Sequence, residues 1–172
     1  MRKSAGFTVV ELIVICVVLG ILVSIGTVAW SATSNRSTDR TLAAEQQAWL
    51  KQFETYRQRF NVYPNANSSG VAITGDHCLG TGFASGRCKG GATPVTENAS
   101  SAIMLQLAKV GTAPDYPRKG AINGYSGPWV SYATAGEIRI YQSYKQTECP
   151  EDTTKDTAFT TANICYVRMV KN

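Results

Sequence analysis

Hydrophobic and polar residues are unevenly distributed along the 172-residue chain. Neither a charged residue nor a proline interrupts the stretch from Leu12 to Trp30, whereas the sequence after Ser31 is mixed and largely polar. A helix over these 19 residues would span about 30 Å, the thickness of the hydrocarbon core of a bilayer. The pattern therefore predicts a transmembrane segment followed by a water-soluble part.

The helical pattern continues beyond the apolar segment, because no proline or glycine occurs between Ser31 and Phe60. Large apolar residues recur there at helical spacing and define one face: Leu42, Trp49, Phe53, Tyr56 and Phe60. Charged residues are expected on the other faces: Arg36, Arg40, Glu45, Lys51, Glu54 and Arg57. Pro64 disfavours helical geometry at Tyr63, so a helix starting at Phe7 should end at Asn61 after about 80 Å.

The remaining sequence predicts a small mixed domain. Residues 65–97 are rich in Gly, Ser, Asn and Thr and are expected to form a long loop. A short helix is expected over 98–111, with Asn98 as its N-cap, and another loop over 112–128. Strand-like runs flank Thr134-Ala135-Gly136 within 129–145, and a third run covers 164–170. Three antiparallel strands packed against the apolar helix face give an α+β fold.

Four of the five cysteines lie outside the apolar segment, in two close pairs: Cys78, Cys88, Cys149 and Cys165. Their even number favours disulfides and an oxidising compartment. Three connectivities are possible, and the short loops favour Cys78–Cys88 with Cys149–Cys165. Cys16, inside the apolar segment, is interpreted as a small apolar residue.

Metal sites and catalytic sites have weaker support. The cysteine spacings do not match the CxxC pairs that zinc sites use. The single histidine, His77, is flanked by Asp76 and Cys78, but side chains of consecutive residues do not converge on one point to form a catalytic or metal site. Glu151, Asp152 and Asp156 allow a calcium loop, but a solvated loop is the simpler explanation of these residues. We therefore expect no metal, no cofactor and no enzymatic activity.

Net charge gives little evidence of a partner. Two of the 17 basic residues, Arg2 and Lys3, precede the apolar segment, which leaves 15 basic against 12 acidic residues. This small excess does not argue for nucleic-acid binding. The position of Arg2 and Lys3 predicts a cytoplasmic amino terminus, with the rest of the chain facing outward.

Glu11 is the unusual residue, because a carboxylate within hydrocarbon costs about 2.5–3.5 kcal/mol on insertion scales. A plain membrane anchor does not explain it. A secretory signal fits poorly too, because Ser24-Ile25-Gly26 and Trp30-Ser31-Ala32 make poor cleavage sites. Cleavage between Gly6 and Phe7 would instead create an amine at Phe7. The Glu11 carboxylate of one subunit could then pair with that amine in a neighbour and fix the register between helices.

A basic leader ending in Gly6 precedes Phe7-Thr-Val-Val-Glu11-Leu-Ile and an apolar helix. This combination resembles the leader and cleavage site of type IV pilins and type II secretion pseudopilins. The resemblance implies cleavage after Gly6 by a prepilin peptidase, N-methylation of Phe7, and assembly into a filament through the helix. It covers roughly residues 1–33. Many pilins carry a proline in the hydrophobic half of this helix, whereas this chain has none before Pro64.

The expected organisation is a leader at 1–6, a membrane and filament-core half-helix at 7–30, an amphipathic half-helix at 31–61 and a globular part at 62–172. The resemblance implies a pilin that waits in the membrane and then enters a homo-oligomeric surface filament. Minor pilins and a membrane assembly platform would be its partners. The alternatives are a pseudopilin of a secretion or DNA-uptake machine and a minor pilin acting as an adhesin or DNA receptor.

The DNA-receptor alternative depends on a set of strand aromatics and cations that could form a stacking surface for nucleic acid: Tyr125, Trp129, Tyr132, Tyr141, Tyr144, Arg139 and Lys145. Aromatic residues on strands more often belong to the core, and this is the competing interpretation.

Overall fold

A computed structural model describes residues 8–66, 69–97, 101–114, 116 and 120–171 of the chain. The chain forms two compact units, Met1–Ser37 and Thr38–Asn172. Helix α1 (Val9–Phe60) occupies the described part of the first unit and continues into the second. The boundary between the units therefore lies within the helix, beyond the expected end of the membrane segment at residue 30.

The long helix predicted from the sequence is confirmed over the described residues. α1 contains 52 residues without a break. Asn61 ends it in the left-handed conformation, with φ of 57°, and donates its N–H to the carbonyl of Arg57 at 2.7 Å. This is a common way to close the last helical turn, and asparagine tolerates it better than most residues.

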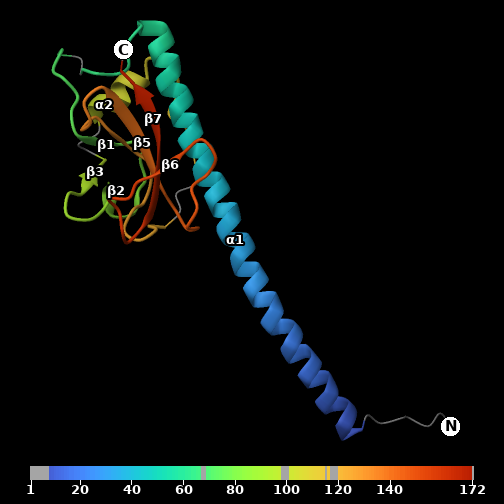
Figure 1. Cartoon of the computed structure of the whole chain (residues 1–172). Coiled ribbons are helices and arrows are strands. Elements are labelled where there is room, and N and C mark those ends of the chain that lie inside the picture. The colour runs from blue at the N-terminus through green and yellow to red at the C-terminus, as the bar shows by residue number, and fades with distance from the viewer. Residues whose placement is uncertain (1–7, 67–68, 98–100, 115, 117–119, 172) are drawn as a thin grey trace. The chain divides into compact units, whose positions relative to one another are not determined.

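A five-stranded antiparallel sheet forms the centre of the second unit (Figure 1). Its strands follow the order β1 (Asp76–Cys78), β4 (Trp129–Ser131), β5 (Glu137–Tyr144), β7 (Asn163–Val170) and β6 (Thr154–Lys155). The three predicted strands correspond to β4, β5 and β7. The expectation of three strands was nevertheless wrong, because β1 and β6 extend both edges. Strands of three and two residues are too short to leave an alternating pattern in the sequence.

The turn between β4 and β5 follows the predicted glycine signal. Gly136 has a φ of 73°, and Glu137 donates its N–H to the carbonyl of Thr134 at 3.3 Å. A positive φ at this position favours glycine because a side chain would be strained there. The turn brings β4 and β5 into register, with Trp129 opposite Tyr141.

One face of the sheet packs against α1 and helix α2 (Ser101–Leu107). Trp49 and Phe53 of α1 are fully buried with Ile138 and Ile140 of β5, and Leu42 and Tyr56 are also buried. The predicted apolar face is confirmed for these four helix residues. Phe60, the last residue of α1, is the exception at 40% exposed.

Helix α2 lies within the predicted 98–111 segment but is shorter than expected. Ile103 and Leu107 are buried in the core, whereas Leu105 is 66% exposed. The expected N-cap, Asn98, lies outside the described residues.

Glu45 was wrongly placed among the solvent-facing charges, because it is only 3% exposed. It follows Leu42 by three residues and precedes Trp49 by four. Residues at these spacings share a helix face, so Glu45 belongs to the packed side of α1.

The expected long loop over 65–97 was also wrong in part. Besides β1, it contains a short 3-10 helix η1 (Ala84–Gly86) and a two-stranded sheet of β2 (Arg87–Lys89) and β3 (Val95–Thr96). Cys88 and Val95 from this small sheet pack with Trp129 and Tyr141 on the face of the main sheet that α1 does not cover. Both faces of the central strands are therefore buried.

Candidate assembly site

The first turn of α1 shows how the chain accommodates Glu11. Thr8 precedes the helix and donates both its N–H and its Oγ1 hydroxyl to Glu11 Oε2, at 3.1 and 3.0 Å. Glu11 returns a hydrogen bond from its own N–H to Thr8 Oγ1 at 3.2 Å. This reciprocal arrangement is a capping box, which satisfies amide groups that have no partner inside the helix.

Thr8 was missed in the sequence, although a Thr-x-x-Glu pattern directly before an apolar run signals such a cap. The capping box gives Glu11 a role within its own chain. It uses only Oε2 among the described contacts, so Oε1 remains for a donor from elsewhere. Gly6 and Phe7, the expected cleavage site and methylated residue, lie outside the described residues.

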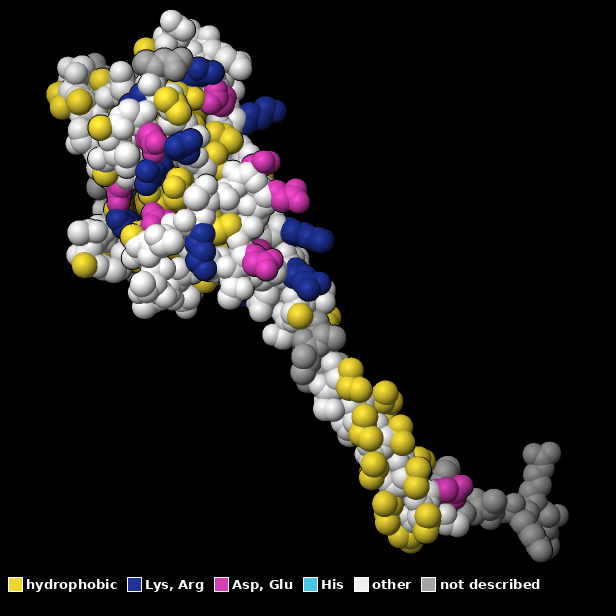
Figure 2. All heavy atoms as spheres, in the orientation of Figure 1, with side chains coloured by type: hydrophobic (Ala, Val, Ile, Leu, Met, Phe, Trp, Pro, Cys, Tyr) yellow, Lys and Arg dark blue, Asp and Glu magenta, His cyan; other side chains and the backbone are white. Residues whose placement is uncertain are grey.

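Beyond the cap, apolar side chains cover the visible face of the amino half of α1 (Figure 2). The large apolar residues from Val9 to Ile25 are each between 46% and 75% exposed. Within the described part of the chain, α1 is long and apolar enough to cross a membrane, as judged by length and composition. A continuous apolar surface of this size needs lipid or protein to cover it.

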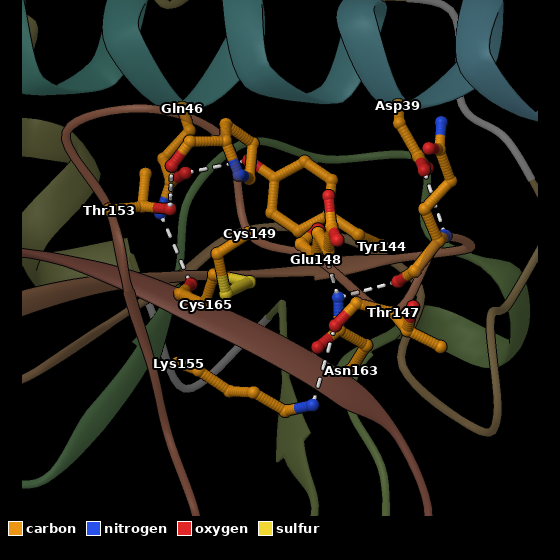
Figure 3. The surroundings of a disulfide bond; sticks show 12 residues. Asp39, Gln46, Tyr144, Thr147, Glu148, Cys149, Thr153, Lys155, Asn163 and Cys165 are labelled. Carbon is orange, nitrogen blue, oxygen red and sulfur yellow. Dashed lines mark hydrogen bonds between the residues drawn. A yellow bond between two sulfur atoms is a disulfide. The ribbon is translucent and has the colours of Figure 1, made fainter.

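In the second unit, the Cys149–Cys165 disulfide joins the loop after β5 to the middle of β7, with a Cα–Cα distance of 5.8 Å (Figure 3). Cys165 is fully buried beside Leu42 and Tyr144, whereas the intervening residues Glu151 and Asp152 are exposed. The loop contains β6, which pairs with β7 at Thr154 and Lys155. Part of the predicted polar loop is therefore an edge strand.

Two polar residues of α1, Gln46 and Asp39, bind the chain next to this disulfide (Figure 3). Gln46 is fully buried; it donates Nε2 to the carbonyls of Ile140 and Cys165, at 2.8 and 3.3 Å, and accepts the Tyr144 hydroxyl at 2.7 Å. Burial, followed by the charges of Asp39 and Glu45, raises the pKa of Tyr144 well above its usual range, so this hydroxyl stays a donor.

Asp39 holds the chain that leaves β5. Its two carboxylate oxygens accept the N–H groups of Lys145 and Gln146, each at 2.9 Å. Together with Gln46, it attaches α1 to the loop that the Cys149–Cys165 disulfide closes. Neither residue was identified from the sequence.

The second disulfide, Cys78–Cys88, joins β1 to β2 with a Cα–Cα distance of 5.5 Å. Both cysteines are fully buried on the sheet face away from α1. Cys16 is a free cysteine and is exposed on the apolar part of α1. The disulfides Cys78–Cys88 and Cys149–Cys165 are the connectivity that the short sequence separations predicted.

The proposed stacking surface for nucleic acid is not available on the folded unit. Trp129 and Tyr144 are 1% exposed, and Tyr132 and Tyr141 are 7% exposed. Trp129 stacks on Tyr141 with centroids 5.1 Å apart, and Phe159 covers both rings edge-on. Trp129, Tyr141 and Phe159 therefore contact one another, because they belong to the core on the sheet face away from α1.

The residues considered for metal binding do not come together. Among the residues that the structure describes, no group of three or more His, Cys, Asp or Glu side chains is placed to hold an ion. Asp156 instead accepts the N–H of Ala158 at 2.9 Å, and His77 Nε2 lies 2.8 Å from the carbonyl of Thr74.

The comparisons bear on the start of the chain. Residues 1–27 match the profile of the prokaryotic N-terminal methylation motif, which includes Gly6, Phe7 and Glu11. This chain carries the leader signature of type IV pilins and pseudopilins. No curated protein and no solved structure gives a match to the chain. The family match therefore covers the leader and the first turns of α1 and does not extend into the second unit.

Proposed function

We propose that this chain is a structural pilin, the subunit of a type IV pilus-like surface filament, and not an enzyme. The methylation motif over residues 1–27 carries the proposal, because it covers the start of a helix whose large apolar residues from Val9 to Ile25 are all exposed. Such a helix suits a subunit that is first held by lipid and later by neighbouring helices. A pseudopilin of a secretion or DNA-uptake machine shares the same leader and helix.

In this proposal a prepilin peptidase cuts between Gly6 and Phe7, and Phe7 becomes N-methylated. The first amine then lies one residue before Thr8, at the start of the capping box. Glu11 Oε1 can accept that amine from a neighbouring subunit while Oε2 still accepts from Thr8. Assembly therefore does not require the cap to break.

The two disulfides of the second unit are consistent with an extracellular location. Both cysteine pairs of the second unit are oxidised, and disulfides persist in oxidising compartments. Burial of the strand aromatics removes the main support for a stacking-type DNA receptor, so a structural role is the simpler proposal.

Mass spectrometry of filaments sheared from cells tests the proposal. We expect this chain as an abundant component that begins at Phe7 with a methylated amine. Glu11→Ala should stay in the membrane fraction but give few fibres, because the partner of the Phe7 amine is lost. A chain that retains its first six residues in the native state, or normal fibre yield from Glu11→Ala, would contradict the proposal.

A further inference from the structure

The end of α1 borders a cavity of about 350 Å³ that no feature discussed so far uses. This volume lies in the range of small-molecule sites. Its floor is Ile138, which is fully buried, and its rim includes Val62 and Tyr63. All these residues belong to the second unit.

Two cations line the cavity. Arg57 comes from the last turn of α1, and Lys171 follows β7, which ends beside α1 (Figure 1). Gly136 accepts the N–H of Lys171 at 2.8 Å, and the Lys171 ammonium lies 5.3 Å from the centroid of the Tyr132 ring. Lys171 is therefore held in place by the β4–β5 turn and by an aromatic ring.

The positive charge of this cavity is only partly compensated. Arg57 Nε donates to Glu54 at 3.1 Å, and Glu54 also accepts the Tyr63 hydroxyl. Lys171 has no carboxylate partner among the described residues, and no acidic residue lines the cavity. The described residues thus leave an excess positive charge facing a small cavity with an apolar floor.

Three residues that carry side-chain amides complete the lining: Gln58, Asn61 and Asn65. An amide both donates and accepts hydrogen bonds, which suits hydroxyl groups better than bare anions. The last carbonyls of a helix also lack intrahelical partners, and Gln58 and Asn61 lie at that end of α1. Those carbonyls carry partial negative charge and disfavour a dianion such as phosphate more than a monoanion.

We propose that this cavity binds an acidic sugar, a polyhydroxylated ring that carries one carboxylate. Its carboxylate pairs with Lys171 and with the guanidinium of Arg57, its hydroxyls bond to the amides, and its C–H face packs on Ile138 and Val62. Charge-assisted hydrogen bonds of this kind are the stronger contacts in such a site. The inference concerns a ligand of the globular unit and does not depend on filament assembly.

The test is calorimetric titration of the full chain in detergent micelles with D-glucuronate. We expect saturable binding that weakens with added salt, because exposed charges are screened. Lys171→Gln should weaken it about tenfold or more, the loss expected for a charged hydrogen bond. D-glucose lacks the carboxylate. Its affinity for the unaltered chain should be no higher than the affinity of D-glucuronate for the Lys171→Gln variant.

Lys51→Gln is the matched control, because Lys51 is an exposed lysine of α1, in the same unit as Lys171, and does not line the cavity. It makes the same charge change and should leave binding unaltered. Val62→Phe, which narrows the cavity without changing charge, should weaken binding as Lys171→Gln does. A melting curve for each variant establishes that it remains folded.

Several results would overturn the inference: no saturable binding, equal binding by Lys171→Gln and Lys51→Gln, or tighter binding of glucose 6-phosphate than of glucuronate. A lower melting temperature for Lys171→Gln with unchanged affinity would also overturn it. The cations would then serve only to offset the partial charge at the end of α1.

Discussion

At the start of α1, Glu11 takes part in two interactions that separate substitutions can distinguish. One is the capping box with Thr8, and the other is the proposed ion pair with the Phe7 amine of a neighbour. Glutamine serves as well as glutamate in a capping box but carries no charge. Alanine at Thr8 removes the cap and leaves the carboxylate.

The first prediction follows from this difference. Glu11→Gln should insert into the membrane normally and give few filaments, because only the ion pair is lost. Thr8→Ala should assemble, with the helix start weakened by about 1 kcal/mol. Fibre yield, measured by immunoblotting of the sheared surface fraction, checks both variants. The opposite ranking would mean that the cap controls assembly and the ion pair does not.

Gln46 is the residue that links α1 to the two longest strands. We expect Gln46→Ala to lower the free energy of unfolding by about 2–4 kcal/mol, because two backbone carbonyls and the Tyr144 hydroxyl lose their partner inside the core. Gln47 is the exposed neighbour of Gln46, and Gln47→Ala should change the free energy of unfolding by less than about 0.5 kcal/mol. Urea unfolding of both variants is the measurement. Equal effects would show that the hydrogen bonds of Gln46 contribute little.

At the scale of elements, the sequence predicted the helix and strands that have a periodic pattern, and it missed the shortest strands and the long-range hydrogen bonds. β5 and β7, with eight residues each, and the apolar face of α1 have clear periods. β1 and β6 are stabilised by their neighbours in the sheet, so their own residues carry little signal. Asp39 and Gln46 bind backbone groups about 100 residues away, which no local pattern encodes.

The loop between β5 and β7 depends on its disulfide. Replacing Cys149 and Cys165 together by alanine should lower the free energy of unfolding by about 3 kcal/mol, because a closed loop of this length restricts the unfolded chain. Cys16→Ala should leave it unaltered, because Cys16 is free and exposed. Denaturant titration under non-reducing conditions measures both. A similar stability for all three proteins would mean that β6 and Asp39 hold the loop without the disulfide.

At the scale of the whole chain, the two units bury their surfaces differently. The described apolar residues of Met1–Ser37 are exposed, whereas the three hydrophobic clusters formed by described residues lie within Thr38–Asn172. Both disulfides also lie in the second unit. Among the described residues, the buried core contacts therefore lie within the second unit, and the exposed apolar surface of the first unit requires a partner or lipid.

We therefore expect a chain that starts at Thr38 to fold as a soluble monomer with both disulfides formed. Its unfolding should be cooperative, and its amide spectrum should be dispersed, because Trp49 and Phe53 retain their partners on β5. The full chain should need detergent, because the exposed apolar surface of α1 remains. Two-dimensional amide NMR and non-reducing mass spectrometry test the shortened chain. If it proved unfolded or aggregated, the first 37 residues would contribute to the stability of the globular unit as well as to anchoring and assembly.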